Sequence, residues 1–391
     1  MEAAALSSMA VPARENVRAE GLPWYCLTAI FGALCIPIGA LWDISWHSTI
    51  GRDTFWTPAH ITIHLGGLIP GFTAGWLALR ATWFGTPEEK AAAVRLGPFR
   101  APLGAWVIIW GAFAMLLSAP FDDWWHNAYG LDVEILSPPH TVLAAGMYAV
   151  AIGALLLVLS YQNRTGARAG SALFVFATGI LLAMATIIVT EKSYPNQQHG
   201  VTFYTLAAAI YPLYLVAAAR ASKARWAATG AAAVYMAIVC AMIWILPLFR
   251  AQPMLAPIYN PVDRMVPPVF PLLLIVPGFL IDLVLRINAG RHSMARDWLL
   301  AALLGMVFVG ALLAVQIPFS SFLLSPAANN WFFSGDRHWP YFIELGDWRL
   351  RHWNPAEDAL TLQGLSVVLL LGIFKSRIAL AFGGWMAKVR R

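Results

Sequence analysis

Two short stretches of this sequence place carboxylates and imidazoles where long apolar runs meet. The first runs from Asp43 to His64 and also contains His47 and His60. Asp43 and His47 are four residues apart, so a continuous helix would carry both on one face. Pro58 is typical of a helix start, which puts His60 in the first turn of the next helix and His64 one turn further along. If the two helices pack together, one carboxylate and two or three imidazoles converge.

The second stretch, residues 122–140, repeats this order of residue types. Asp122 stands four residues before His126, and a Pro-x-His sequence ends at His140. The first acid and the first histidine of the two stretches are each 79 residues apart. We therefore expect a tandem repeat of a helix, acidic loop, helix unit. The duplication favours a functional site over two unrelated helix caps.

Carboxylates and imidazoles are metal ligands, but these residue types alone do not identify the metal. One carboxylate with two imidazoles fits non-haem Fe(II), catalytic Zn(II) with a bound water, or Cu(II). The absence of Cys and the scarcity of Met in both stretches argue against a Cu(I) transport site. His64 is a candidate extra ligand or proton shuttle. Asp53 and Asp132 are expected to support the ligands or to cap loops.

The composition predicts the elements that carry these residues. Of the 391 residues, 59% are hydrophobic and 12% are charged, and the mean hydropathy is +0.65. Continuous apolar runs of about 20 residues match transmembrane helices, whereas a β-barrel needs short alternating segments. Lys375 and Arg377 interrupt the last run, so nine spans and one interfacial helix are the alternative to ten. We expect an all-α, polytopic transmembrane helical bundle with spans at 24–45, 58–84, 101–121, 138–162, 171–190, 199–220, 226–249, 267–287, 297–317 and 360–382.

Basic residues in the short loops predict the orientation of the chain. They gather after the second, fourth, sixth and eighth spans and at the C-terminus, while the loop after the third span contains four acids and no basic residue. Both termini, including a tail at residues 1–22, are therefore expected on the cytoplasmic side of a bacterial inner membrane. The two acid/histidine stretches then face the outer side. The net charge of +6 follows from this distribution and does not indicate nucleic-acid binding.

The chain divides into two parts near residue 165. Residues 23–165 form the expected metal-binding unit of four transmembrane helices, and residues 166–391 add further spans. The segment 318–357 is too polar to span a membrane. We expect it to cap the outer face or to contact a partner, with its aromatic residues at the membrane interface.

The second part contains few ionisable groups that could do chemistry. Glu191 with His199 is the nearest approach to a third copy of the acid/histidine pattern. Asp282 lies inside the eighth span, where an acid either relays protons or pairs with an arginine. The three cysteines of the chain all lie in apolar runs, which excludes a disulfide framework.

The stretch DISWHSTIGRDTFWTPAH, residues 43–60, resembles a segment of the C subunit of the copper membrane monooxygenases. That family includes particulate methane monooxygenase and ammonia monooxygenase. In its C subunit the segment runs from an Asp, through Trp-His and Arg-Asp-Thr, to Pro-x-His. The stretch DDWWHNAYGLDVEILSPPH, residues 122–140, resembles the neighbouring copper site of the family. The resemblance covers about residues 24–165.

The resemblance implies a copper cofactor and two sets of ligands. The methane enzyme has Asn at the position of Asp122, so this chain keeps the oxygen ligand and adds a negative charge that favours a divalent metal. His64 stands where the family has an apolar or aromatic residue. The matching ligand positions are Asp43, His47 and His60 in the first set and Asp122, His126 and His140 in the second.

The activity implied by the resemblance is oxygenation of a small apolar substrate or of ammonia with O₂. The enzymes of the family contain three different subunits, so other membrane subunits and a periplasmic cupredoxin-like subunit are the expected partners. Electrons would come from a donor such as quinol, because the sequence has no haem or flavin motif. The alternatives are a non-enzymatic protein that holds or transfers copper, and a proton-coupled transporter.

Overall fold

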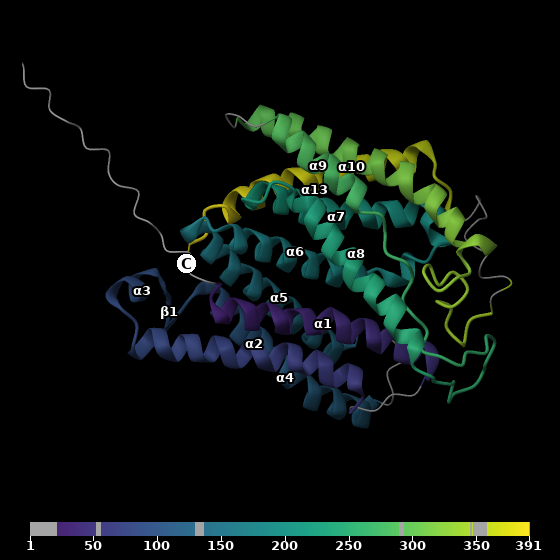
Figure 1. Ribbon diagram of the computed structural model, residues 1–391, viewed down its shortest axis with the longest axis horizontal. Coiled ribbons are helices and arrows are strands. Elements are labelled where there is room, and N and C mark those ends of the chain that lie inside the picture. The colour runs from purple at the N-terminus through teal and green to yellow at the C-terminus, as the bar shows by residue number, and fades with distance from the viewer. Residues whose placement is uncertain are drawn as a thin grey trace, which may run out of the picture.

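The computed structural model describes residues 22–51, 56–129, 137–288, 293–344, 346 and 358–390. Within these residues the chain is mostly helical, with a single two-stranded hairpin. In the same part of the chain, nine helices are long and apolar enough to cross a membrane. They lie side by side along the long axis of the molecule (Figure 1). The predicted helical bundle is confirmed.

The nine long helices account for most of the chain. They are α1 (Trp24–Thr49), α2 (Pro58–Trp83), α4 (Leu103–Tyr129), α5 (Pro138–Thr165), α6 (Arg168–Ile188), α7 (Val201–Ala221), α8 (Ala227–Ile245), α10 (Met294–Leu323) and α13 (Leu362–Met386). The shorter elements are α3 (Pro87–Ala92), the antiparallel strands β1 (Val94–Leu96) and β2 (Phe99–Ala101), α9 (Ile275–Ile287), and 3-10 turns at Thr190–Lys192, Gln197–His199, Leu246–Leu248 and Pro326–Ala328.

The eighth expected span, 267–287, is helical only in its second part, α9. The chain before α9 is not helical and is largely buried. Because this stretch is not a helix, its backbone N–H groups need other acceptors. The hydroxyl of Tyr235 in α8 is one of them and accepts the N–H of Leu272 at 2.9 Å. Proline lacks an N–H and disfavours helix at the residue before it. Three prolines therefore prevent the helix here: Pro267, Pro268 and Pro271.

Two other helices also differ from their expected bounds. α13 continues through Lys375 and Arg377, so the span expected to be weakest is a complete helix. α4 continues to Tyr129, beyond its expected end at residue 121. Asp122 therefore lies on a helix and not in the acidic loop that the sequence predicted.

Glycines allow close contact within each of the first two helix pairs. A Cβ on Gly111 of α4 would lie 2.7 Å from the backbone N of Val150 in α5. A Cβ on Gly66 of α2 would lie 3.0 Å from the carbonyl oxygen of Gly32 in α1. Small residues at helix crossings let two backbones touch within a membrane. Each pair therefore holds the end of its first helix near the start of its second.

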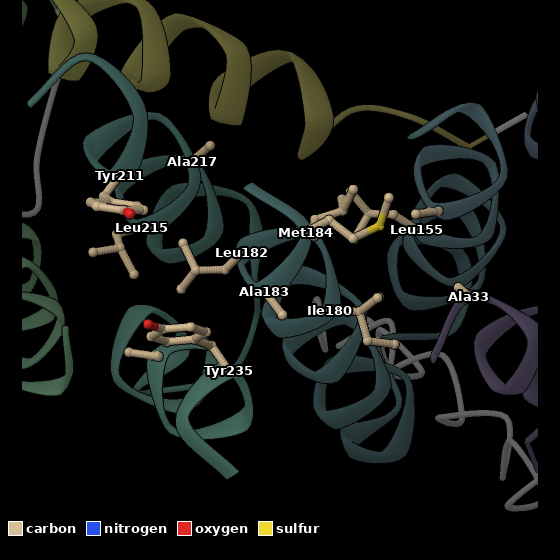
Figure 2. Close-up of a cluster of buried hydrophobic side chains, with 14 of the residues drawn as sticks. Ala33, Leu155, Ile180, Leu182, Ala183, Met184, Tyr211, Leu215, Ala217 and Tyr235 are labelled. Atoms are coloured by element: carbon tan, nitrogen blue, oxygen red, sulfur yellow. The ribbon is translucent and has the colours of Figure 1, made fainter. Parts of the chain in front are cut away.

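α6 lies inside the bundle and joins its two halves. It is the most buried of the long helices in the described chain. Figure 2 shows Leu182 of α6 near Tyr211 of α7 and Tyr235 of α8. The same view shows Met184 of α6 close to Leu155 of α5. Residues 23–165 and the later helices thus share one hydrophobic core.

α1 and α4 end, and α2 and α5 begin, at one end of the bundle, which we call the histidine end. Residues 324–344 pack against this end. Within them, Trp339 is fully buried and stacks on Tyr194 with ring centroids 5.6 Å apart. The segment expected at 318–357 therefore begins at residue 324, and its central tryptophan is a core residue. Residues 345 and 347–357 lie outside the described chain.

Candidate metal centre

The first acid/histidine set joins the last two turns of α1 to the first turn of α2. Asp43 and His47 lie in α1, and His60 is the third residue of α2. The Nε2 atom of His60 is 3.2 Å from Oδ1 of Asp43, and Nε2 of His47 is 3.8 Å from Oδ2 of Asp43. One carboxylate thus faces two imidazoles, each through a different oxygen. The structure brings the three predicted residues together.

The start of α2 fixes the position of His60. Thr57 is the N-cap residue, and its hydroxyl accepts the backbone N–H of His60 at 3.1 Å. Pro58 occupies the first helical position. An N–H group at this position would have no partner within the helix, so the lack of one in proline costs no hydrogen bond. The cap satisfies one of the free N–H groups at the helix start. It therefore holds the backbone that carries the imidazole.

The second set has the same construction at the junction of α4 and α5. His140 Nε2 is 3.6 Å from Asp122 Oδ1. Ser137 caps α5 and accepts the backbone N–H of His140 at 3.4 Å, ahead of Pro138 at the first helical position. His126 lies on α4 four residues after Asp122, and its side chain lies outside the described structure.

One pair of the first set, Asp43 and His60, has the residue types and the spacing of two groups that share a metal ion. Two ligand atoms about 2.0–2.1 Å from a shared ion lie roughly 2.9–3.4 Å apart at square-planar or tetrahedral angles. The 3.2 Å separation of Asp43 and His60 falls in this range. Asp43 Oδ1 is shielded from solvent, and no described group gives it a well-formed hydrogen bond.

As the described side chains lie, the first set is not closed around a metal position. Among the described residues, no group of three His, Cys, Asp or Glu side chains has an arrangement that could hold an ion as it stands. At 3.8 Å, His47 is too far from Asp43 to share an ion with it without moving. Its side chain is 47% exposed at the end of α1.

His64 lies one turn beyond His60 on α2 and is partly buried. Its ring is close enough to that of His60 for an electrostatic interaction. It is therefore placed beside the first set, deeper in the bundle. Asp53 and Asp132, which were expected to support the ligands, lie outside the described residues.

Asp282 has a structural role that the sequence did not predict. Its carboxylate accepts the backbone N–H of Ala228 at 3.2 Å, and it accepts both the N–H and the hydroxyl of Thr229, at 2.9 and 2.7 Å. These are groups of the first turn of α8. Asp282 on α9 thus caps the start of a neighbouring helix. The nearby Arg286 packs over the ring of Trp226, 3.8 Å from its centroid.

His199 does not complete a third set. Its Nε2 is 2.9 Å from the hydroxyl of Ser321 and 3.3 Å from that of Ser320, both on α10, while Glu191 is exposed. Burial lowers the pKa of His199 below its ordinary value, and a contact with the carbonyl of Pro195 acts in the opposite direction. The residue ties the turn before α7 to α10.

Sequence reasoning missed the two cap residues, Thr57 and Ser137. Each is a hydroxyl residue directly before the proline of a Pro-x-His sequence. A hydroxyl N-cap followed by proline at the first helical position is a recognised sign of a helix start. The signal was therefore present in both stretches.

Comparison with known proteins found no relative of this chain. No family model, no curated protein and no solved structure matches the chain. The two acid/histidine sets are therefore the features of the molecule that indicate a function.

Proposed function

We propose that this chain is a membrane copper-binding protein of the monooxygenase type, acting alone or as a subunit. The observation that supports the proposal is the meeting of Asp43 with His60 and His47 across two helices. The approach of His140 to Asp122 supports a second centre of the same kind. Two unrelated ion pairs would not require the same cap, the same proline and the same order of residues at both places.

Copper would supply the activation of O₂. The chain would supply the ligands and their orientation, from Asp43, His47 and His60 in the first set and Asp122, His126 and His140 in the second. His64, one turn deeper on α2, would hold or transfer a proton. The carboxylates of both sets are mostly buried, at 23% and 27% exposed, which limits the access of water to these two groups.

The proposal includes the setting of the two centres. They would face the outer side of a bacterial inner membrane, with both termini in the cytoplasm and the two helix pairs related as a tandem repeat. The substrate would be a small apolar molecule or ammonia. A quinol would provide electrons, and other membrane subunits, with a periplasmic cupredoxin-like subunit among them, would complete the assembly.

The contacts of Asp282 favour a structural role over the proton relay of a transporter. Its carboxylate accepts three hydrogen bonds at the start of α8 and so holds the beginning of that helix. If the same ligands bind copper but the protein turns over no substrate, the chain is a copper-holding or assembly protein. A product assay distinguishes this alternative from an oxygenase.

The first experiment measures metal content and electron paramagnetic resonance on purified protein. The variants are His60→Ala and His140→Ala, with His199→Ala as a matched control that removes a histidine outside both sets. We expect copper with nitrogen couplings, reduced in each of the first two variants and unchanged in the control. Iron or zinc in its place would assign a different chemistry to the same ligands. Absence of any metal after reconstitution would contradict the proposal.

A second assay separates an oxygenase from a copper carrier. Protein loaded with copper is supplied with a reductant, O₂ and a candidate substrate, and ¹⁸O incorporation into the product is measured. Product that depends on O₂ and on His60 supports an enzyme. Copper that stays bound without any product would support a protein that holds copper and is not an enzyme.

A further inference from the structure

Three consecutive residues at the end of α1 receive hydrogen bonds from two distant segments of the chain, residues 249–266 and 338–342. The carbonyl of Ser48 accepts the N–H of Tyr341 at 3.0 Å. The carbonyl of Ile50 accepts the N–H of Met254 at 2.9 Å. Thr49 lies between them, and its hydroxyl accepts the N–H of Val266 at 2.8 Å. Figure 1 shows the loop that follows α8 beside this end of α1.

Thr49 connects this contact to the helix itself. It is the last residue of α1 and is fully buried. Its hydroxyl donates to the carbonyl of Ser45 at 2.6 Å while it accepts from Val266. A hydroxyl that donates to one segment and accepts from another fixes both. Ser45 lies between Asp43 and His47, so the helix turn that Thr49 fixes is the turn that carries both ligands.

Tyr341 and Gly51 complete the contact. The carbonyl of Tyr341 accepts the N–H groups of Tyr259 and Asn260 at 2.9 and 2.8 Å, so the two distant segments are also bonded to each other. The Tyr341 hydroxyl occupies the space that a Cβ on Gly51 would need. Gly51 has φ +80°, a conformation that favours glycine. Any larger residue here would push Tyr341 away from α1.

Helix ends need partners of this kind. The last four carbonyl groups of a helix receive no hydrogen bond from an N–H group of the same helix. A helix end whose carbonyls find no other partner frays. His47 is only two residues from the end of α1. Fraying would move its imidazole relative to Asp43, and metal affinity depends on ligands held in place by supporting hydrogen bonds.

We propose that residues 249–266 and 338–342 form a cap on α1, anchored by the hydroxyl of Thr49, that holds Asp43 and His47 in position for the metal. The cap itself does not depend on the proposed function; only the statement that it positions Asp43 and His47 for a metal rests on that function. It gives the second half of the chain a role at the first acid/histidine set, and Thr49 is a positioning residue in it.

The first test uses metal-free protein and measures amide hydrogen exchange in residues 45–51. Thr49→Val keeps the shape of the side chain and removes the hydroxyl, and Thr49→Ser keeps the hydroxyl. The matched control is Thr178→Val, since the buried Thr178 hydroxyl donates only to the carbonyl of Phe174 in its own helix. We expect exchange at least about ten-fold faster in Thr49→Val, and wild-type rates in the other two. Unchanged exchange in Thr49→Val would overturn the cap.

The second test titrates copper into the same variants. We expect Thr49→Val to weaken binding at the first set by about ten-fold and to change its resonance spectrum. Thr49→Ser should restore both, and the second set should be unaffected, because Thr49 makes its hydrogen bonds to α1 and to Val266. Copper that binds to wild type and Thr49→Val with equal affinity would overturn the positioning role. If wild type binds no metal, the proposed function fails and the exchange experiment still decides the cap.

Discussion

Asp43 and His60 face each other across the junction of α1 and α2, with His60 Nε2 3.2 Å from Asp43 Oδ1. The second oxygen of the carboxylate faces His47 on its own helix. A single carboxylate is therefore the point at which the two helices and the two imidazoles meet.

Replacing Asp43 tests the charge of the first set. Asp43→Asn keeps an oxygen ligand and removes the negative charge, while Asp43→Leu removes both. We expect copper affinity at this set to fall by about ten-fold to a hundred-fold in the first variant and to be lost in the second. Titration followed by paramagnetic resonance measures the change. Equal affinity in wild type and Asp43→Leu would contradict ligation by this residue.

The caps at Thr57 and Ser137 are expected to act on stability and on ligand position together. Thr57→Ala removes the acceptor of the His60 N–H and should cost about 1 kcal/mol of unfolding free energy. It should also weaken copper binding at the first set only, and Ser137→Ala should do so at the second only. Thr57→Ser should restore both properties. Thermal unfolding and copper titration of the three variants provide the measurement.

Much of the site could be predicted from local sequence. The spacing of Asp43 and His47, and the proline before His60, describe contacts within one helix turn or at a helix start. Helix periodicity and proline stereochemistry decide such contacts. Which helices meet was predicted only through the short connection between consecutive spans.

Other parts of the structure could not be predicted in this way. Apolar composition gives residues 267–274 the character of a span, although three prolines exclude a helix there. The bonds of Thr49 to Val266 and of Ser48 to Tyr341 join residues more than 200 positions apart. No spacing pattern in the sequence reports such contacts, because they depend on how the later helices pack.

Enlarging a glycine at the α4–α5 contact should affect the second set alone. A Cβ on Gly146 would lie 2.8 Å from the carbonyl oxygen of Gly111. Gly146→Leu should therefore separate the helices and lower the unfolding free energy by about 1–3 kcal/mol. The His140 ligand should lose affinity for copper, with the first set retained. Gly75→Leu is the control, since a Cβ there meets nothing within 4 Å.

Asp282 is expected to matter for folding and not for proton movement. Asp282→Ala leaves N–H groups of Ala228 and Thr229 without their acceptor and should cost about 1–3 kcal/mol of unfolding free energy. Asp282→Asn keeps one oxygen and should cost less. Thermal unfolding measures both. A pH-driven flux in liposomes that Asp282→Asn abolishes without a loss of stability would restore the transporter alternative.

The pH dependence of stability should report His199. Burial lowers its pKa in the folded protein below the ordinary value of 6.5, which applies to the unfolded chain. The unfolded chain therefore binds the proton more readily, and the stabilisation from the neutral ring is complete above about pH 6.5 and lost as the pH falls through the folded-state value. His199→Gln lacks this titration, and all other groups are common to both proteins. The difference in Tm between wild type and variant should therefore decrease from pH 7.5 to pH 5. A difference that stays constant or grows over this range would show that burial does not hold the histidine in its neutral form.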